Sequence, residues 1–221
     1  MLSRTSVSSD AEETLISKIK IEIGMQSVSK YVQMKTDIHT SDSLVEEFRQ
    51  QQHHGVIKGV ALTAKVLTTG LWECEQNASC KLPAELKACS EAFEKFYKSR
   101  HTGKNISWTA GLGDCEIVSH GYAKPYTFIV TPYQAAIIML FTTKDVYTGQ
   151  EISDFTSLPF DIMNIQMFNL MHPKLGRLLI KANAKVTKVA HDENIRINNE
   201  FASSSLRIVL VPFPPKVVIA E

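Results

Sequence analysis

The chain has 221 residues, of which 44% are hydrophobic and 21% are charged, and its formal net charge is +1. These values are typical of a globular protein, and the nearly neutral charge gives no overall attraction to nucleic acid or to an anionic membrane. Apolar runs such as "AAIIML" at 135–140 are far shorter than the roughly 20 residues of a spanning helix, and "MLSRTSVSSDAEETL" lacks the apolar core of a signal peptide, so we expect a soluble, unsecreted protein with no membrane partner.

The N-terminal quarter predicts helices. Residues 9–23 carry one apolar stripe that ends at Gly24, and residues 27–38 and 43–54 repeat that spacing. Short amphipathic helices of this kind cannot bury their stripes alone. We therefore expect residues 1–56 to be the tail of a helical bundle whose earlier part is absent from this chain.

The next region mixes strands with one helix. Residues 60–67 alternate between apolar and polar side chains and predict a strand, and a helix is expected to begin at Pro83. Residues 106–112 and 115–118 predict a hairpin that turns at Gly113 and Asp114, and "YTFIV" at 126–130 predicts another strand. Residues 57–131 should therefore form a small mixed sheet with a packed helix.

Residues 132–217 predict a winged helix-turn-helix. Capping boxes at Thr131–Gln134 and Thr148–Glu151 open two helices, and "FDIMNIQMFNLM" gives a third that ends before His172. After "GRLLIKA" and the polar loop "HDEN", the segments "IRINNEF" and "LRIVLV" predict a strand pair. The prolines of "PFPPKVV" predict an exit linker, and the fold class of the whole chain is α+β.

One stretch, "HTGKNISWTAGLGDCEIVSHG" at 101–121, resembles an active site in composition. Cys115 could act as a nucleophile activated by His101 or His120, but no residue nearby would orient the base. "GLG" is not followed by a helix that could bind phosphate, and the cysteines at 74, 80, 89 and 115 lack the ligand spacing of a zinc site or a disulfide framework. We therefore predict reduced thiols, no catalytic residue, no metal and no cofactor.

Nucleic-acid binding is the main alternative, because many winged helices place their third helix in the major groove. Here that helix contains no Lys or Arg, so it offers almost no donors to phosphate or guanine. The expected use of the helix is packing, and we predict no nucleic-acid partner. The alternative stays open because basic residues lie near the wing: Lys181, Lys185, Lys188, Arg196 and Arg207.

Several motifs together resemble the cullin homology region. They include "ALTAKVLTTGLW" and "LPAELKACSEAFEKFYKSRHTGKNISWTAGLGDCEI", followed by "YTGQEISDFTSLP", "HPKLGRLLIK" and "INNEFASSSLRI". With "SVSSDAEETLISKIK" and "VEEFRQ" nearer the N-terminus, the resemblance covers residues 5 to about 211. The cullin-like subunit of the anaphase-promoting complex shares part of this pattern, but "FYKSRHTG" and the helical matches favour an ordinary cullin.

The resemblance implies a non-catalytic scaffold of a cullin-RING ubiquitin ligase in the cytoplasm and nucleus. Its sheet would accept a strand from a RING-box protein, which in turn recruits a ubiquitin-conjugating enzyme, and substrate-receptor adaptors would bind only through a missing N-terminal region. Strand addition satisfies backbone groups at a sheet edge. The residues expected to form the docking sheet are Val60, Leu62, Ala64, Val66 and Leu67, with Trp108 and Ile117 on neighbouring strands.

Two departures from the family pattern are visible. Glu73 stands where many cullins have a proline after the tryptophan, which leaves the shape of that loop open. Family members also continue into a second winged helix that carries a lysine for a ubiquitin-like modifier, and no motif of this chain matches it. We therefore expect a C-terminal cullin fragment or a short cullin-like protein.

Overall fold

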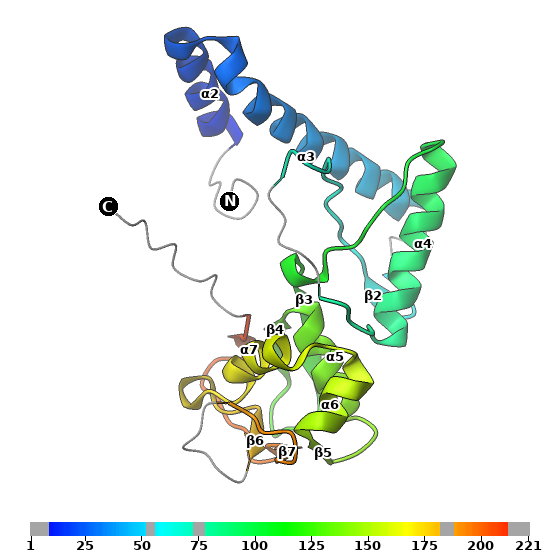
Figure 1. The fold of residues 1–221 in the computed structure, drawn as a ribbon, viewed down its shortest axis with the longest axis vertical. Coiled ribbons are helices and arrows are strands. Elements are labelled where there is room, and N and C mark those ends of the chain that lie inside the picture. The colour runs from blue at the N-terminus through cyan, green and yellow to red at the C-terminus, as the bar shows by residue number, and fades with distance from the viewer. Residues whose placement is uncertain (1–8, 52–55, 73–77, 182–187, 212–221) are drawn as a thin grey trace. The chain divides into compact units, whose positions relative to one another are not determined.

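The computed structural model of the chain describes residues 9–51, 56–72, 78–181 and 188–211 (Figure 1). Contacts divide the chain into two compact units, which are residues 1–74 with 85–107 and residues 75–84 with 108–221. The chain therefore leaves the first unit, returns to it for one helix and then enters the second unit. The domain boundaries after residues 56 and 131 follow sequence patterns rather than contacts, and they stay a prediction.

The first unit begins with two helices, α2 (Ser9–Ile23) and α3 (Met25–Gln51). They meet at Gly24, whose φ of +85° favours glycine and whose N–H donates to the Lys20 carbonyl. The prediction of α2 is confirmed, whereas the separate helices predicted at 27–38 and 43–54 are continuous as far as Gln51, and residues 52–54 lie outside the described residues. The weak helix formers at 39–43 did not interrupt it, because propensity is a weak prior that tertiary contacts override.

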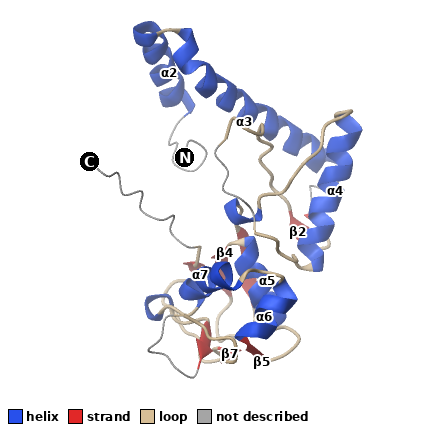
Figure 2. Cartoon of the chain, viewed as in Figure 1, coloured by secondary structure: helices blue, strands red, loops and turns tan. Residues whose placement is uncertain are grey.

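A short hairpin follows, with β1 (Val56–Ile57) antiparallel to β2 (Val60–Ala61). Its turn residues Lys58 and Gly59 both have positive φ, as a tight two-residue hairpin turn requires. Residues 62–68 then run without pairing to any described strand, and Figure 2 draws them as a loop. We call residues 62–68 the extended segment.

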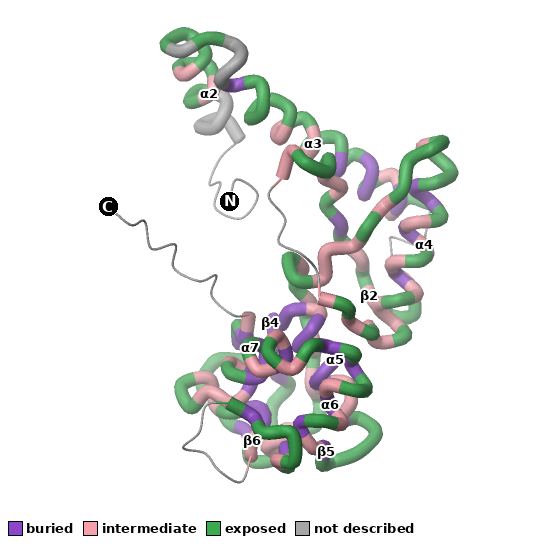
Figure 3. The backbone as a smooth tube through the Cα atoms, in the orientation of Figure 1, coloured by how far each residue is buried: buried purple, intermediate pink, exposed green. Residues whose placement is uncertain are grey.

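The core of this unit is aromatic. Helix α4 (Ala84–Arg100), which was predicted, packs Phe93 and Phe96 against Phe48 of α3, with ring centroids 5.1 and 5.3 Å from that of Phe48. The Phe48 side chain is fully buried, and buried residues concentrate in the second half of α3 and along α4 (Figure 3). Burial of aromatic side chains is what holds these two helices together.

The second unit contains two small sheets. In the first, β3 (Cys115–Ser119) pairs antiparallel with β4 (Tyr126–Val130), and β4 pairs in parallel with β8 (Arg207–Val209). The predicted hairpin between 106–112 and 115–118 was therefore wrong: residues 110–112 form a 3₁₀ turn, and β3 takes β4 as its partner. The prediction that "LRIVLV" pairs with "IRINNEF" was also wrong, because β8 joins β4.

The other sheet belongs to a winged helix. Its strands lie in the order β5 (Val146–Thr148), β7 (Asn194–Ile197), β6 (Leu179–Lys181), and its helices are α5 (Pro132–Leu140), α6 (Gly149–Thr156) and α7 (Phe160–Leu170). The chain order of helix, strand, two helices and a strand pair is the one that a winged helix uses. Both predicted capping boxes are present, at Thr131–Gln134 and Thr148–Glu151.

Candidate docking site

The structure brings five of the seven predicted site residues together on one stretch of chain. Val60 lies on β2, and the other four, Leu62, Ala64, Val66 and Leu67, lie on the extended segment. Trp108 and Ile117 belong to the second unit, where Trp108 precedes the 3₁₀ turn and Ile117 pairs with Phe128 across β3 and β4. The seven residues therefore do not share one described sheet.

Side chains of α3 hold the extended segment. The Ser41 hydroxyl accepts a hydrogen bond from the Val66 N–H at 2.7 Å and donates to the Ala64 carbonyl at 3.5 Å. Ser41 is 1% exposed, so these bonds lie away from solvent. A buried hydroxyl that satisfies two backbone groups takes over the role of a neighbouring strand at that point.

Further contacts lie on both sides of Ser41 along the helix. Towards its C-terminal end, the Arg49 guanidinium donates to the Thr63 hydroxyl at 2.8 Å, and Asp42 forms an ion pair with Lys65. Going along the segment from Thr63 to Val66, the contacting residues on α3 run back from Arg49 to Ser41. The segment therefore runs antiparallel to α3. This explains why the strand predicted at 60–67 ends at Ala61: α3 side chains, rather than a strand, occupy one side of the backbone.

The extended segment ends at a carboxylate clamp. Asp37 accepts hydrogen bonds from the N–H and the hydroxyl of Thr68 and from the indole N–H of Trp72, all at 2.9 Å. Burial alone would raise the pKa of Asp37, but these hydrogen bonds stabilise the charged form and lower the pKa below its ordinary value of 3.8. The clamp therefore carries a negative charge at neutral pH.

Asp37, Ser41 and Arg49 were not among the predicted site residues. Their spacing offered a signal, because positions 37, 41 and 49 fall on one face of a helix at steps of four and eight residues. The predicted break between helices at 27–38 and 43–54 separates position 37 from positions 41 and 49, so the shared face is not apparent from that prediction. A polar stripe on a helix is usually solvated, and it points to a binding face only once the following segment is known to lie against it.

A thiol active site does not form around Cys115. Burial, assisted by the neighbouring Asp114 carboxylate, raises the pKa of Cys115 to about 11, which suppresses the reactive thiolate. His101 packs on Tyr97 in the other unit, and His120 lies five residues along the chain from Cys115, or about 16 Å in an extended strand. His120 is therefore not placed to act as the base, and His101 belongs to a different unit from Cys115.

Helix α7, the third helix of the winged helix, offers few groups that could contact DNA. The exposed positions of α7 include Asp161, Ile165 and Phe168, and the helix contains no Lys or Arg. Among the basic residues near the wing, Lys181 pairs with Glu193 and Arg207 pairs with Glu116. These two ion pairs reduce the positive charge that Lys181 and Arg207 could offer to phosphate.

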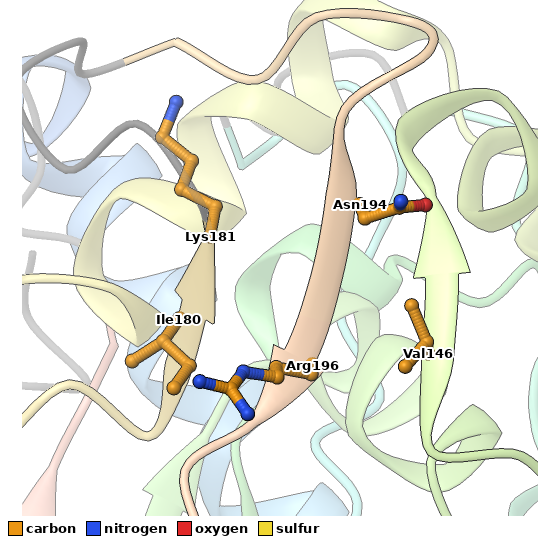
Figure 4. A pocket seen from close by; sticks show the side chains of 5 residues that line it. All are labelled: Val146, Ile180, Lys181, Asn194 and Arg196. Carbon is orange, nitrogen blue, oxygen red and sulfur yellow. The ribbon is translucent and has the colours of Figure 1, made fainter.

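The remaining wing residues were the basis of the nucleic-acid alternative. Lys185 lies outside the described residues, and Lys188 and Arg196 are exposed. Arg196 stands between Val146 and Ile180 in a shallow pocket on the β5–β7–β6 sheet (Figure 4). Lys181 and Asn194 also line this pocket, and the Lys181 ammonium is paired with Glu193.

The described residues contain neither a membrane-spanning helix nor a cluster of metal-binding side chains. None of their helices is long and apolar enough to cross a membrane. Within the same residues, His, Cys, Asp and Glu side chains nowhere gather in threes that could hold a metal ion. Cys74, one of the cysteines weighed as a metal ligand, lies outside the part of the chain that the structure describes.

Two models of known protein families match this chain. The model of the cullin alpha+beta domain matches residues 66–201, and that of the cullin alpha solenoid domain matches residues 1–45. Cullin-3 of Dictyostelium discoideum is 35% identical over 170 residues, which is 76% of this chain and 22% of that protein.

Two plant proteins match over most of the chain. Cullin-3B of Arabidopsis thaliana is 31% identical over 94% of this chain, and Cullin-1 of Oryza sativa subsp. japonica is 30% identical over 95% of it. In both cases the match covers 28% of the plant protein, so this chain spans about a quarter of the length of the curated relatives.

Proposed function

Because the chain belongs to the cullin family, we propose that it is part of the scaffold of a cullin-RING ubiquitin ligase and docks a RING-box protein by strand addition. The RING-box protein would bring a ubiquitin-conjugating enzyme, and this chain would perform no bond chemistry. Adaptors for substrate receptors would bind to a region that the longer relatives contain. The cytoplasm and the nucleus are the expected compartments.

The observation that carries this proposal is the extended segment. Residues 62–68 make no ladder with a described strand, and one side of their backbone is taken up by α3. A free backbone edge is a template for an incoming strand, since its N–H and C=O groups gain hydrogen-bond partners on binding. The near-neutral net charge fits this mode, which depends on backbone pairing rather than on long-range attraction.

Trp108 and Ile117 stay candidate docking residues on the second unit. Both are partly buried in the unit to which they belong. Ile117 lies on β3, an edge strand of the β3–β4–β8 sheet within the described residues. An edge strand is a second place at which a partner segment could pair, and Ile117 would lie beside it.

Co-expression with a RING-box protein tests the proposal. We expect the two chains to co-purify through size exclusion as a complex. Lys65→Pro should weaken the complex strongly because proline has no N–H and disrupts strand pairing. Lys65→Ala is the matched control, since both substitutions remove the ion pair with Asp42 but only proline removes the N–H. A folded chain that forms no complex, or equal binding by both variants, would contradict strand addition at this segment.

A further inference from the structure

Along the extended segment, every second residue bonds to α3 through its backbone. The backbone groups that bond to α3 are the Ala64 carbonyl and the N–H groups of Val66 and Thr68. In an extended chain, the N–H and C=O of one residue point to one side, and those of the next residue point to the other. The even-numbered residues therefore direct their peptide groups towards α3.

The odd-numbered residues direct theirs away from the helix. The peptide groups of Thr63, Lys65 and Leu67 make no hydrogen bond with the backbone of another described residue. Their side chains still contribute to holding the segment, since the Thr63 hydroxyl accepts from Arg49 and Lys65 pairs with Asp42. The helix thus fixes the segment, while the peptide groups of Thr63, Lys65 and Leu67 keep an edge that no described residue pairs with.

The two elements also match in length. From Asp37 to Arg49 the helix rises about 18 Å, at 1.5 Å per residue. From Thr63 to Thr68 an extended chain covers about 17 Å, at 3.3 Å per residue. Contacts at both ends and at Ser41 in the middle can therefore be made together, and they keep the segment straight between them.

We infer that α3 is a one-sided template that holds residues 63–68 extended and presents the peptide groups of Thr63, Lys65 and Leu67 to the incoming strand, with Ser41 as the central positioning residue. This inference rests on the proposed function for the identity of the partner. Beyond the proposed function, it specifies which backbone groups would bond to the partner strand and which side chains of α3 hold those groups in position. A segment ordered before binding loses less conformational entropy when the partner arrives, which favours affinity.

Residue-resolved amide exchange, followed by NMR, tests the template in the free chain. Val66 and Thr68 should exchange more slowly than Thr63, Lys65 and Leu67. Ser41→Ala should speed the exchange of Val66 by about tenfold, because it removes the acceptor of that N–H. Ser43→Ala is the control, since the Ser43 hydroxyl donates to the His39 carbonyl within the same helix. Equal exchange in the two variants would overturn the inference.

The complex with the RING-box protein provides the second arm. We expect binding to slow exchange at Thr63, Lys65 and Leu67, with little change at Val66 and Thr68. Ser41→Ala should weaken binding by about tenfold while Ser43→Ala leaves it unchanged. New protection on binding that is confined to the even-numbered residues would overturn the inference. Full affinity of Ser41→Ala, despite faster exchange at Val66, would overturn it as well. In either case, docking of the RING-box protein itself would still stand. If the wild-type chain does not bind, the proposed function fails, and the exchange arm alone decides whether α3 holds the segment.

Discussion

Trp72 donates its indole N–H to the carboxylate of Asp37 at 2.9 Å, which joins the turn after the extended segment to the middle of α3. Asp37 also accepts from the N–H and hydroxyl of Thr68. The same carboxylate thus fixes the end of the extended segment and the tryptophan beyond it. Protonation of this one group would loosen both.

Acid should release this clamp. The pKa of Asp37 is lowered below 3.8 in the folded chain, so the stability that the clamp contributes is fully present above the unfolded value and is lost as the pH falls through the folded value. We expect the Trp72 indole N–H resonance to shift on acidification below about pH 4. Asp37→Asn should abolish that shift, because the side chain keeps an acceptor oxygen and has no charge to lose. An identical titration in both proteins would argue against the clamp.

Phe48→Ala should be among the most damaging substitutions in the first unit. Its ring is fully buried, and its centroid lies 5.1 Å from the ring centroid of Phe93 and 5.3 Å from that of Phe96. Loss of a buried phenyl ring costs about 3–5 kcal/mol of unfolding free energy. Urea unfolding measured by circular dichroism checks this value. Phe155→Ala is the control, because Phe155 is 53% exposed, and a similar loss there would contradict the assignment of the core.

The sequence was most informative where neighbouring residues decide the structure. Thr131 with Gln134 and Thr148 with Glu151 form capping boxes at the predicted places, because each box needs only residues three apart. Helix α4 follows in the same way from the three-and-four spacing of Cys89, Phe93 and Phe96. These elements are defined by contacts within one turn of helix or between adjacent turns.

Pairing between distant segments was not predictable from these patterns. The Thr127 N–H bonds to the Leu206 carbonyl, which places β8 beside β4, but alternation along "LRIVLV" does not say which strand is its neighbour. The same limit applies to the candidate site. Alternation at 60–67 predicted a strand, of which only Val60–Ala61 pairs, and the role of Ser41 depends on a contact with Val66 across 25 residues.

The two capping boxes should differ in energetic weight. Gln134 is 0% exposed and its amide donates to the carbonyls of Gln166 and Leu210, besides accepting from the Thr131 N–H. Gln134→Ala should cost about 3 kcal/mol, because it removes a cap and leaves buried groups unsatisfied. Glu151→Gln should cost much less, since that box is only partly buried and the amide oxygen still accepts from the Thr148 N–H. Thermal unfolding of both variants compares them, and equal losses would contradict the difference.

Cys115 should react slowly with alkylating reagents. At pH 8, a thiol whose pKa is about 11 carries roughly 100-fold less thiolate than one with the ordinary value of 9.0. Iodoacetamide labelling, followed by mass spectrometry of the Cys115 peptide, measures the rate. The same peptide in the urea-unfolded chain is the reference and should react faster by a similar factor. Fast labelling of the folded chain would reopen the thiol-enzyme hypothesis.

Tyr122→Phe should leave stability unchanged or increase it by up to about 1 kcal/mol, because it removes a polar group that gains nothing from burial. The Tyr122 hydroxyl is buried and has no hydrogen-bond partner among the described residues, although its ring packs against Tyr126 and Phe201. Tyr126→Phe is the matched comparison: the Tyr126 hydroxyl accepts from the Ser203 N–H at 3.2 Å, so its removal should cost about 1 kcal/mol. Chemical denaturation of the two variants should therefore give changes of opposite sign, or a loss only for Tyr126→Phe. A clear loss in Tyr122→Phe would mean that its hydroxyl has a stabilising partner after all.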